Sequence, residues 1–104
     1  MRRPGDVHLL DLGLAGKVRP VVVVSRFDPD PPRTLVVYVP LTSQPRSGAY
    51  EVAIPTPPFL DARSVANVQA IGSVPATVLG RRLGRIPEAT LNEIRGALRY
   101  IFEI

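Results

Sequence analysis

The stretch GKVRPVVVVSR, residues 16–26, contains the longest unbroken valine run of the chain, and two cations precede that run. Four consecutive valines, residues 21–24, favour a strand that is buried on both faces. Arg19 and Pro20 come directly before the valines, and Pro20 cannot donate a backbone hydrogen bond. The stretch therefore predicts a buried strand over residues 18–26 with a guanidinium group near its beginning.

Short apolar segments separated by proline and glycine predict further strands on both sides of this one. In chain order, the other expected strands cover residues 5–12, 34–43, 49–54, 64–74 and 80–86. Pro40 lies inside one of them and implies a sheet edge, a bulge or the strand end at that point. Residues 75–79 are compatible with one helical turn that starts at Pro75.

The C-terminal segment has a different pattern, because Leu91, Ile94 and Leu98 recur three and four positions apart. This spacing predicts an amphipathic helix over about residues 87–102. Gly96, near its centre, is small enough to let another element approach. Several short strands followed by one helix predict a mainly β protein with short helices, a compact curved sheet or small barrel that the helix closes at one opening.

Length and residue types indicate one domain without sulfur chemistry. The chain has 104 residues, which fits a single domain over residues 1–104. It has no cysteine and one histidine, so disulfides are excluded and a zinc site is disfavoured. We expect no metal and no cofactor. The missing cysteines are compatible with a cytoplasmic protein.

The charge balance favours an anionic partner. Thirteen residues are Lys or Arg against nine Asp or Glu, and Lys17 is the single lysine. Arginine has a flat, five-donor group that suits phosphates and stacks on bases. Nucleic acid is therefore the first expectation, and an arginine-rich solvated surface is the alternative. No apolar run approaches the roughly 20 residues that cross a membrane, and the N-terminus does not have the pattern of a signal peptide.

Short motifs follow one another in a fixed order along nearly the whole chain. They are GDV at residues 5–7, DLG at 11–13, RPVVVVS at 19–25, VPLTSQ at 39–44 and SVANVQAI at 64–71, followed by a short helical turn and GRRLGRI at 80–86. Each motif alone is weak. The ordered set resembles the MazF/PemK family of toxin ribonucleases.

This resemblance implies a sequence-selective endoribonuclease that cuts single-stranded RNA and is the toxin of a toxin–antitoxin pair. It implies an antiparallel sheet related to the SH3-like barrel, as in the MazF, PemK and CcdB toxins. It further implies a homodimer in the cytoplasm that a cognate antitoxin protein holds inactive. Family members cut RNA without a metal, by attack of the ribose 2′-hydroxyl on the neighbouring phosphate.

The catalytic positions that match the family are Arg19 and Thr42. A fixed cation stabilises the charge that develops on the phosphorane, and the pKa of arginine above 12 argues against a role as base. The Thr42 hydroxyl can bind a non-bridging oxygen or help protonate the departing 5′-oxygen. If the strands over residues 18–26 and 34–43 pair antiparallel, these two side chains lie at neighbouring strand ends.

Further polar residues are candidates for binding the RNA. They are Lys17, Ser43, Gln44, Asn67 and Gln69. If residues 64–74 form one strand, Asn67 and Gln69 share a face of it. That face can line an RNA groove or be an ordinary solvated face of the sheet. Arg19 can likewise be a solvated strand-end cation, and Thr42 and Ser43 ordinary turn residues.

Two aromatic residues have open roles. Tyr38 shares the strand parity of Thr42, so it either faces the groove and stacks on a base or packs in the core. Phe59 lies among prolines and either stacks on RNA or packs at an interface.

The chain departs from the family pattern at several points. The connection over residues 13–18 is shorter than in many relatives, and Gln69 and Gly72 stand where many relatives carry an acidic residue and an arginine. The loss of that positive charge predicts weaker substrate binding. The competing interpretation is therefore a non-catalytic module of the same fold, either a gyrase-poison-like toxin or an RNA-binding protein that does not cut.

Overall fold

The computed structural model describes residues 2–11, 13, 17–55 and 58–104. Its elements, in chain order, are β1 (Asp6–Asp11), β2 (Val18–Val23), β3 (Leu35–Thr42), β4 (Glu51–Ala53), β5 (Val65–Asn67), the 3-10 helix η1 (Val68–Ala70), β6 (Gly72–Pro75), the 3-10 helix η2 (Ala76–Val78), β7 (Arg82–Arg85) and α1 (Glu88–Phe102). Among these described elements, no helix is long and apolar enough to cross a membrane.

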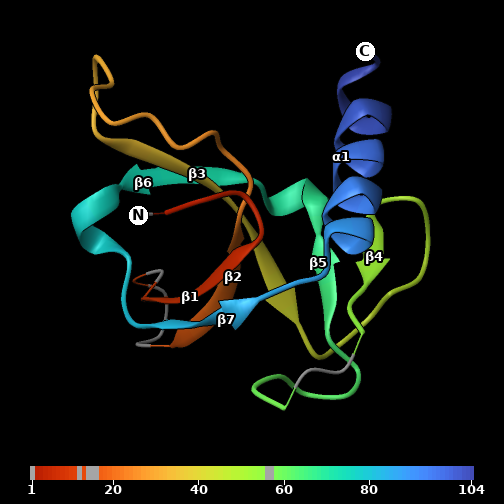
Figure 1. Ribbon diagram of the computed structural model, residues 1–104. Helices are drawn as coiled ribbons and strands as arrows, with labels where there is room; N and C mark the ends of the chain where they lie inside the picture. Colours follow the sequence, from red (N-terminus) through yellow and green to blue (C-terminus); the bar gives the residue numbers. More distant parts are fainter. Residues whose placement is uncertain (1, 12, 14–16, 56–57) are drawn as a thin grey trace.

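All the strand pairs are antiparallel, in the order β4–β5–β3–β2–β1–β7, and β6 pairs with the first half of β3. The sheet curls, and α1 stands at one end of it next to β4 and β5 (Figure 1). This arrangement confirms the expected curved antiparallel sheet with a C-terminal helix.

The valines of β2 supply two separate cores. Val21, Val22 and Val23 are fully buried. Val22 belongs to the larger cluster, which α1 covers with Leu91 and Ile94, whereas Val21 and Val23 belong to a second cluster. Successive side chains of a strand point to opposite faces, so this division confirms that the strand is buried on both sides.

Helix α1 follows the predicted pattern, with one correction. Leu91 and Ile94 are buried and Leu98 is half-buried, as the spacing predicts. No other element approaches Gly96 as was expected, because apart from its chain neighbours and its own helix backbone no described atom lies within 4 Å of the position that a Cβ would occupy there. Gly96 faces open space because it lies off the apolar stripe of the helix.

Residues 64–74 do not form the single strand that their apolar character predicts. Strand β5 ends at Asn67, and the chain then turns through η1 before β6 begins. The Asn67 side chain starts this turn, since its Oδ1 accepts a hydrogen bond from the Gln69 backbone N–H at 3.1 Å. A local side-chain bond of this kind competes with strand pairing, and periodicity does not reveal it.

Pro40 lies where β3 exchanges one neighbour for another. On one side it pairs with Val21 of β2. On the other side β6 pairs as far as Tyr38 and β5 begins at Leu41, so no strand pairs with Pro40 there. The Val37 carbonyl accepts a hydrogen bond from the Val24 N–H, which follows β2, so the backbone polar groups of Val37 face the β2 side. Backbone polar groups of successive strand residues point to alternate sides, and Pro40 is three residues further on, so its nitrogen faces the gap between β6 and β5. The proline thus occupies a local sheet edge.

Candidate active site

The antiparallel pairing of β2 with β3 brings Arg19 and Thr42 to the same end of these two strands. The β2–β3 register pairs Val21 with Pro40, and the pairing ends there. Arg19 precedes Val21 by two residues and Thr42 follows Pro40 by two, so both residues lie just beyond the last pair, at the same end of the two strands. This confirms the antiparallel pairing from which their proximity was expected.

Both residues line the same two cavities, which also share Leu41 and Ser43. The first, of about 300 Å³, is named the Phe59 cavity, and its further lining residues include Phe59, Leu60, Asp61, Ser64 and Leu83. The second, of about 260 Å³, is named the Asn67 cavity, and its further lining residues are Pro40, Gln44 and Asn67.

Arg19 is exposed, its backbone pairs with Leu10 of β1, and its side chain has no hydrogen bond or ion pair with any other described residue. Its guanidinium group is therefore available to a ligand, and it can engage two phosphate oxygens at once. The buried valines that follow it in β2 hold its backbone in place, which is the support that a site built from few groups requires.

Thr42 is half-buried, and its hydroxyl takes part in a turn. Its Oγ1 accepts a hydrogen bond from the Gln44 backbone N–H at 3.1 Å. A hydroxyl has two lone pairs and one proton, so the Thr42 proton remains free to be donated. Thr42 can therefore stabilise the turn and donate a hydrogen bond to a ligand at the same time, because the turn bond uses a lone pair of Oγ1 and leaves its proton.

The five candidate RNA-binding residues divide into two groups. Ser43, Gln44 and Asn67 line the Asn67 cavity. Lys17 and Gln69 are exposed and line neither cavity. The premise that Asn67 and Gln69 share one strand face was wrong, because Gln69 belongs to η1 and not to a strand.

The connection from β4 to β5 supplies cavity residues that the sequence did not single out, namely Leu60, Asp61 and Ser64. Phe59 was recognised, but its role was open. Its ring packs on β7 so closely that a Cβ at Gly84 would overlap it. The sequence signals for the contact between Phe59 and Gly84 are weak: an aromatic residue in a proline-rich connection and a glycine in a strand.

Tyr38 packs against the second core cluster, which confirms the core interpretation of this residue. Its hydroxyl oxygen would lie 2.7 Å from a Cβ at Gly72. Gly72, where many relatives carry an arginine, is therefore required by packing in this chain, because Tyr38 occupies the space that a larger side chain would need. The short connection that also departs from the pattern lies mostly outside the described residues, at positions 14–16.

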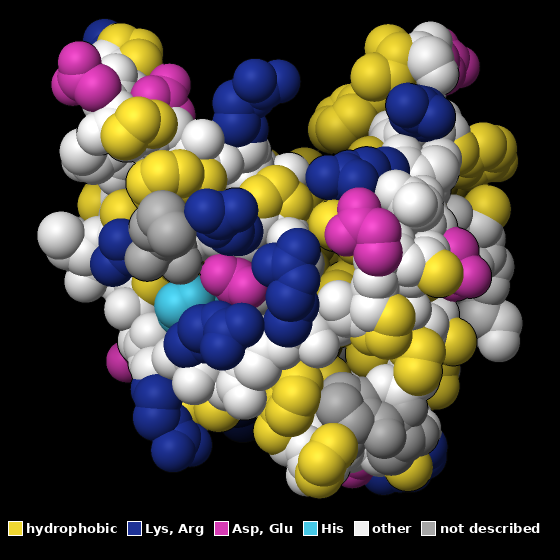
Figure 2. All heavy atoms as spheres, viewed as in Figure 1, with side chains coloured by type: hydrophobic (Ala, Val, Ile, Leu, Met, Phe, Trp, Pro, Cys, Tyr) yellow, Lys and Arg dark blue, Asp and Glu magenta, His cyan; other side chains and the backbone are white. Residues whose placement is uncertain are grey.

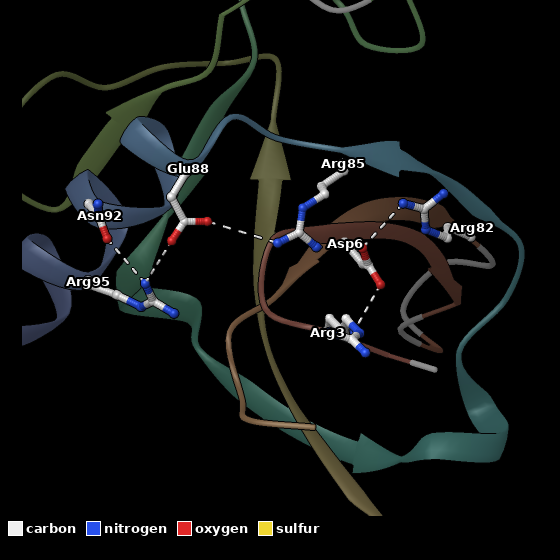
Figure 3. Close-up of polar contacts among 7 residues, drawn as sticks. All are labelled: Arg3, Asp6, Arg82, Arg85, Glu88, Asn92 and Arg95. Carbon is white, nitrogen blue, oxygen red and sulfur yellow. Dashed lines mark hydrogen bonds and ion pairs between the residues drawn. The ribbon is translucent and has the colours of Figure 1, made fainter. Parts of the chain in front are cut away.

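A second polar cluster surrounds Asp6 on the face over β1 and β7, where basic side chains gather around an acidic one (Figure 2). The buried carboxylate accepts bonds from Arg82 at 3.3 Å, Arg85 at 3.1 Å and the Arg3 backbone N–H at 3.0 Å (Figure 3). Glu88 joins Arg85 to Arg95 at 3.9 and 3.5 Å. Arg82 and Arg85 thus serve a structural network.

Burial raises the pKa of Asp6, but the bonds from Arg3, Arg82 and Arg85 outweigh it, so the pKa lies below its ordinary value. The carboxylate is ionised at neutral pH as a result.

The described residues contain no group of three or more His, Asp or Glu that could hold a metal ion. The histidine is buried in β1, where His8 Nδ1 lies 3.0 Å from the Gly80 carbonyl oxygen, and it lines neither cavity.

Residues 3–102 match the family described as PemK-like, MazF-like toxin of type II toxin–antitoxin system. The chain belongs to this family. A curated MazF/PemK relative, the probable endoribonuclease MazF5 of Mycobacterium tuberculosis, is 34% identical over 95 residues, which are 90% of this chain and 86% of the relative. This agrees with the resemblance that the ordered motifs carry.

Solved structures of the family superpose on the whole fold. An endoribonuclease in complex with its cognate antitoxin from Mycobacterial species is 28% identical with a TM-score of 0.87, over 100% of this chain and 97% of that one. The Mycobacterium tuberculosis toxin MazF-mt6 is 26% identical with a TM-score of 0.78, over 98% of both chains. These matches confirm the MazF/PemK fold.

Proposed function

We propose that this chain is the toxin of a type II toxin–antitoxin pair and cuts single-stranded RNA as a metal-independent, sequence-selective endoribonuclease. The family match and the relatives described as endoribonucleases support this proposal. The observation that carries it is that Arg19 and Thr42 line the same two solvent-accessible cavities, with a guanidinium that no other described residue engages and a hydroxyl proton free to be donated.

The proposed reaction is an internal transfer at phosphorus. The ribose 2′-oxygen forms a bond to the neighbouring phosphorus, the bond from phosphorus to the 5′-oxygen breaks, and the proton lost from the 2′-hydroxyl is balanced by one gained at the 5′-oxygen. Arg19 stabilises the negative charge of the five-coordinate phosphorane, and a fixed cation does this without reorganisation. The Thr42 hydroxyl donates a hydrogen bond to a non-bridging oxygen or to the departing 5′-oxygen.

The proposal extends to partners and location. A relative of 28% identity has been solved with its cognate antitoxin, so we expect a cognate antitoxin segment to cover the two cavities and block Arg19. The active toxin is expected to be a homodimer in the cytoplasm. Lys17, Ser43, Gln44, Asn67 and Gln69 are proposed to contact RNA around the cleaved phosphate.

The test is to incubate the purified protein with a long RNA in EDTA and to map the cut ends. We expect 2′,3′-cyclic phosphate and 5′-hydroxyl ends, and no cut where the nucleotide at the cleaved bond is 2′-deoxy. Arg19→Ala and Thr42→Ala should abolish cutting. Arg33→Ala and Thr77→Ala are matched controls, because both residues are exposed and line neither cavity.

Cutting that survives in both active-site variants would contradict the proposal. Intact RNA together with continued growth arrest in cells would favour the alternative, a non-catalytic toxin of the same fold that acts on a protein such as gyrase or binds RNA without cutting it.

A further inference from the structure

The Phe59 cavity has the composition of a pocket for a flat, partly polar ring. Apolar side chains, among them Leu9, Leu41, Phe59 and Leu83, form much of its wall. Ser64 and Asp61 add polar groups from the connection between β4 and β5. A small set of polar groups in an apolar wall is the usual composition of a ligand pocket.

Ser64 is the first polar residue of the cavity wall whose side chain bonds to no other described residue. It is only 5% exposed, and its hydroxyl has no hydrogen bond with any other described residue. Its backbone is held on both sides, because its N–H donates to the Asp61 carbonyl at 3.0 Å and its carbonyl accepts from the Ile54 N–H at 3.0 Å. Among the described residues, the buried side-chain atoms without a partner are Arg2 Nε and His8 Nε2, so the Ser64 hydroxyl reaches the solvent of the cavity, where it can bond to a ligand.

Asp61 is the second polar group, and only one of its oxygens is used. Asp61 Oδ1 accepts a bond from the Arg63 backbone N–H at 2.8 Å and lies 3.6 Å from Arg63 Nε. No described residue bonds to Oδ2. This turn fixes the carboxylate at the cavity and leaves an acceptor for a ligand donor.

Phe59 gives the pocket a rigid aromatic wall. Its ring rests on Gly84 of β7, where a Cβ would overlap it, and packs against the larger core cluster. An aromatic ring held in this way contributes a stacking surface that any base can use.

We propose that the Phe59 cavity is a subsite for a nucleobase next to the cleaved phosphate, and that it selects bases with an amino group over uracil. The inference rests on the proposed ribonuclease function, because Arg19 and Thr42 line this cavity and so set the phosphate at its mouth. Guanine, adenine and cytosine present amino N–H donors to the Asp61 carboxylate, whereas uracil presents two carbonyl oxygens on either side of one N–H. Ser64 supplies a second hydrogen bond to the same base.

The experiment uses the full-length protein and an RNA in which every tetranucleotide occurs, with the cut ends sequenced in EDTA. For the wild type we expect one position next to the cut to favour amino-bearing bases over uridine by about tenfold, since a good side-chain–base pair discriminates on this scale. Asp61→Asn replaces one acceptor with an amide donor, so the preference at that position should shift toward uridine. Ser64→Ala should weaken the preference severalfold at the same position.

Asp28→Asn is the matched control. Asp28 makes the same kind of turn, with its Oδ1 accepting from the Asp30 N–H at 2.9 Å, but lines neither active-site cavity. It should keep the wild-type base preference. Thermal unfolding of each variant shows whether the fold is kept.

The outcomes separate the two proposals. An absence of cutting by the wild type, or cutting at the wild-type rate in both Arg19→Ala and Thr42→Ala, overturns the ribonuclease function itself. Cutting by the wild type with no base preference, or with a preference that Asp61→Asn and Ser64→Ala leave unchanged, overturns only the subsite. An equal loss of cutting at all sequences in a folded Asp61→Asn protein also overturns it, because a base-reading role changes the choice of site.

Discussion

Arg19 is the second residue of β2 and Thr42 the last residue of β3, and both line the same two cavities at one end of this antiparallel strand pair. The buried valines of β2 hold the first residue, and a turn bond from the Gln44 N–H holds the second. We expect a phosphate bound between them to meet a cation and a hydroxyl donor whose backbones are held in place, an arrangement that favours electrostatic catalysis.

Replacing Arg19 separates charge from geometry. Arg19→Ala should lower the single-turnover rate of RNA cleavage by roughly 10²–10³-fold, the usual loss when one oxyanion donor is removed. Arg19→Lys should recover only part of that loss, because an ammonium group keeps the charge but lacks the planar fork. Since the Arg19 side chain is exposed and pairs with no other residue in the described part of the chain, the free energy of unfolding should change by less than about 0.5 kcal/mol. Equal rates for the two variants would contradict a role that depends on the fork.

Thr42 is tested by one variant that keeps the hydroxyl and one that removes it. Thr42→Ser keeps the hydroxyl and should retain most of the cleavage rate. Thr42→Val keeps the shape, loses the free proton and the turn bond from Gln44, and should lower the rate by roughly 10²-fold. Single-turnover cleavage at saturating protein measures both. A valine variant as active as the serine variant would remove Thr42 from the mechanism.

Asp6 should make the stability of the fold depend on acid pH. Its pKa in the folded chain lies below the ordinary value, so the ionised carboxylate adds stability above about pH 4 and loses it as the pH falls through the lowered pKa. Asp6→Asn should lower the free energy of unfolding at pH 7 by about 1–3 kcal/mol, because charge-assisted bonds to Arg82 and Arg85 weaken.

Urea unfolding from pH 7 to pH 2 measures this effect. The difference between wild type and Asp6→Asn should shrink toward pH 2. Asp30→Asn, an exposed aspartate away from any ion pair among the described residues, should follow the wild type at every pH. If the free energy of unfolding differs by the same amount between wild type and Asp6→Asn at every pH, the lowered pKa of Asp6 is contradicted.

Two glycines should respond to alanine with opposite signs. Gly96 is exposed in the middle of α1 with open space around it, so Gly96→Ala should raise the free energy of unfolding by about 1 kcal/mol. Gly84 lies under the Phe59 ring, so Gly84→Ala should lower it by about 1–3 kcal/mol. Thermal unfolding gives both values. The same sign for the two variants would show that one of these local environments is wrong.

Most elements could be predicted from periodicity, and the failures have local causes. The strand expected over residues 64–74 is broken because the Asn67 side chain caps η1, a hydrogen bond that an apolar pattern does not encode. The expected contact at Gly96 fails because a small residue permits an approach without requiring one. Lys17 and Gln69 lie outside both cavities, and their contact with RNA stays a prediction.

The sequence by itself determined the mainly β fold, the helix at its end and the family, and it led to the proposal of Arg19 and Thr42, because strand and helix periods and ordered motifs are local properties of a chain. The tertiary structure alone decided that Asp61 and Ser64 border the same cavity as these two residues. Their connection is held there by contacts between distant segments, such as Phe59 on Gly84, and such contacts depend on how the whole sheet curls rather than on the order of residues in the loop.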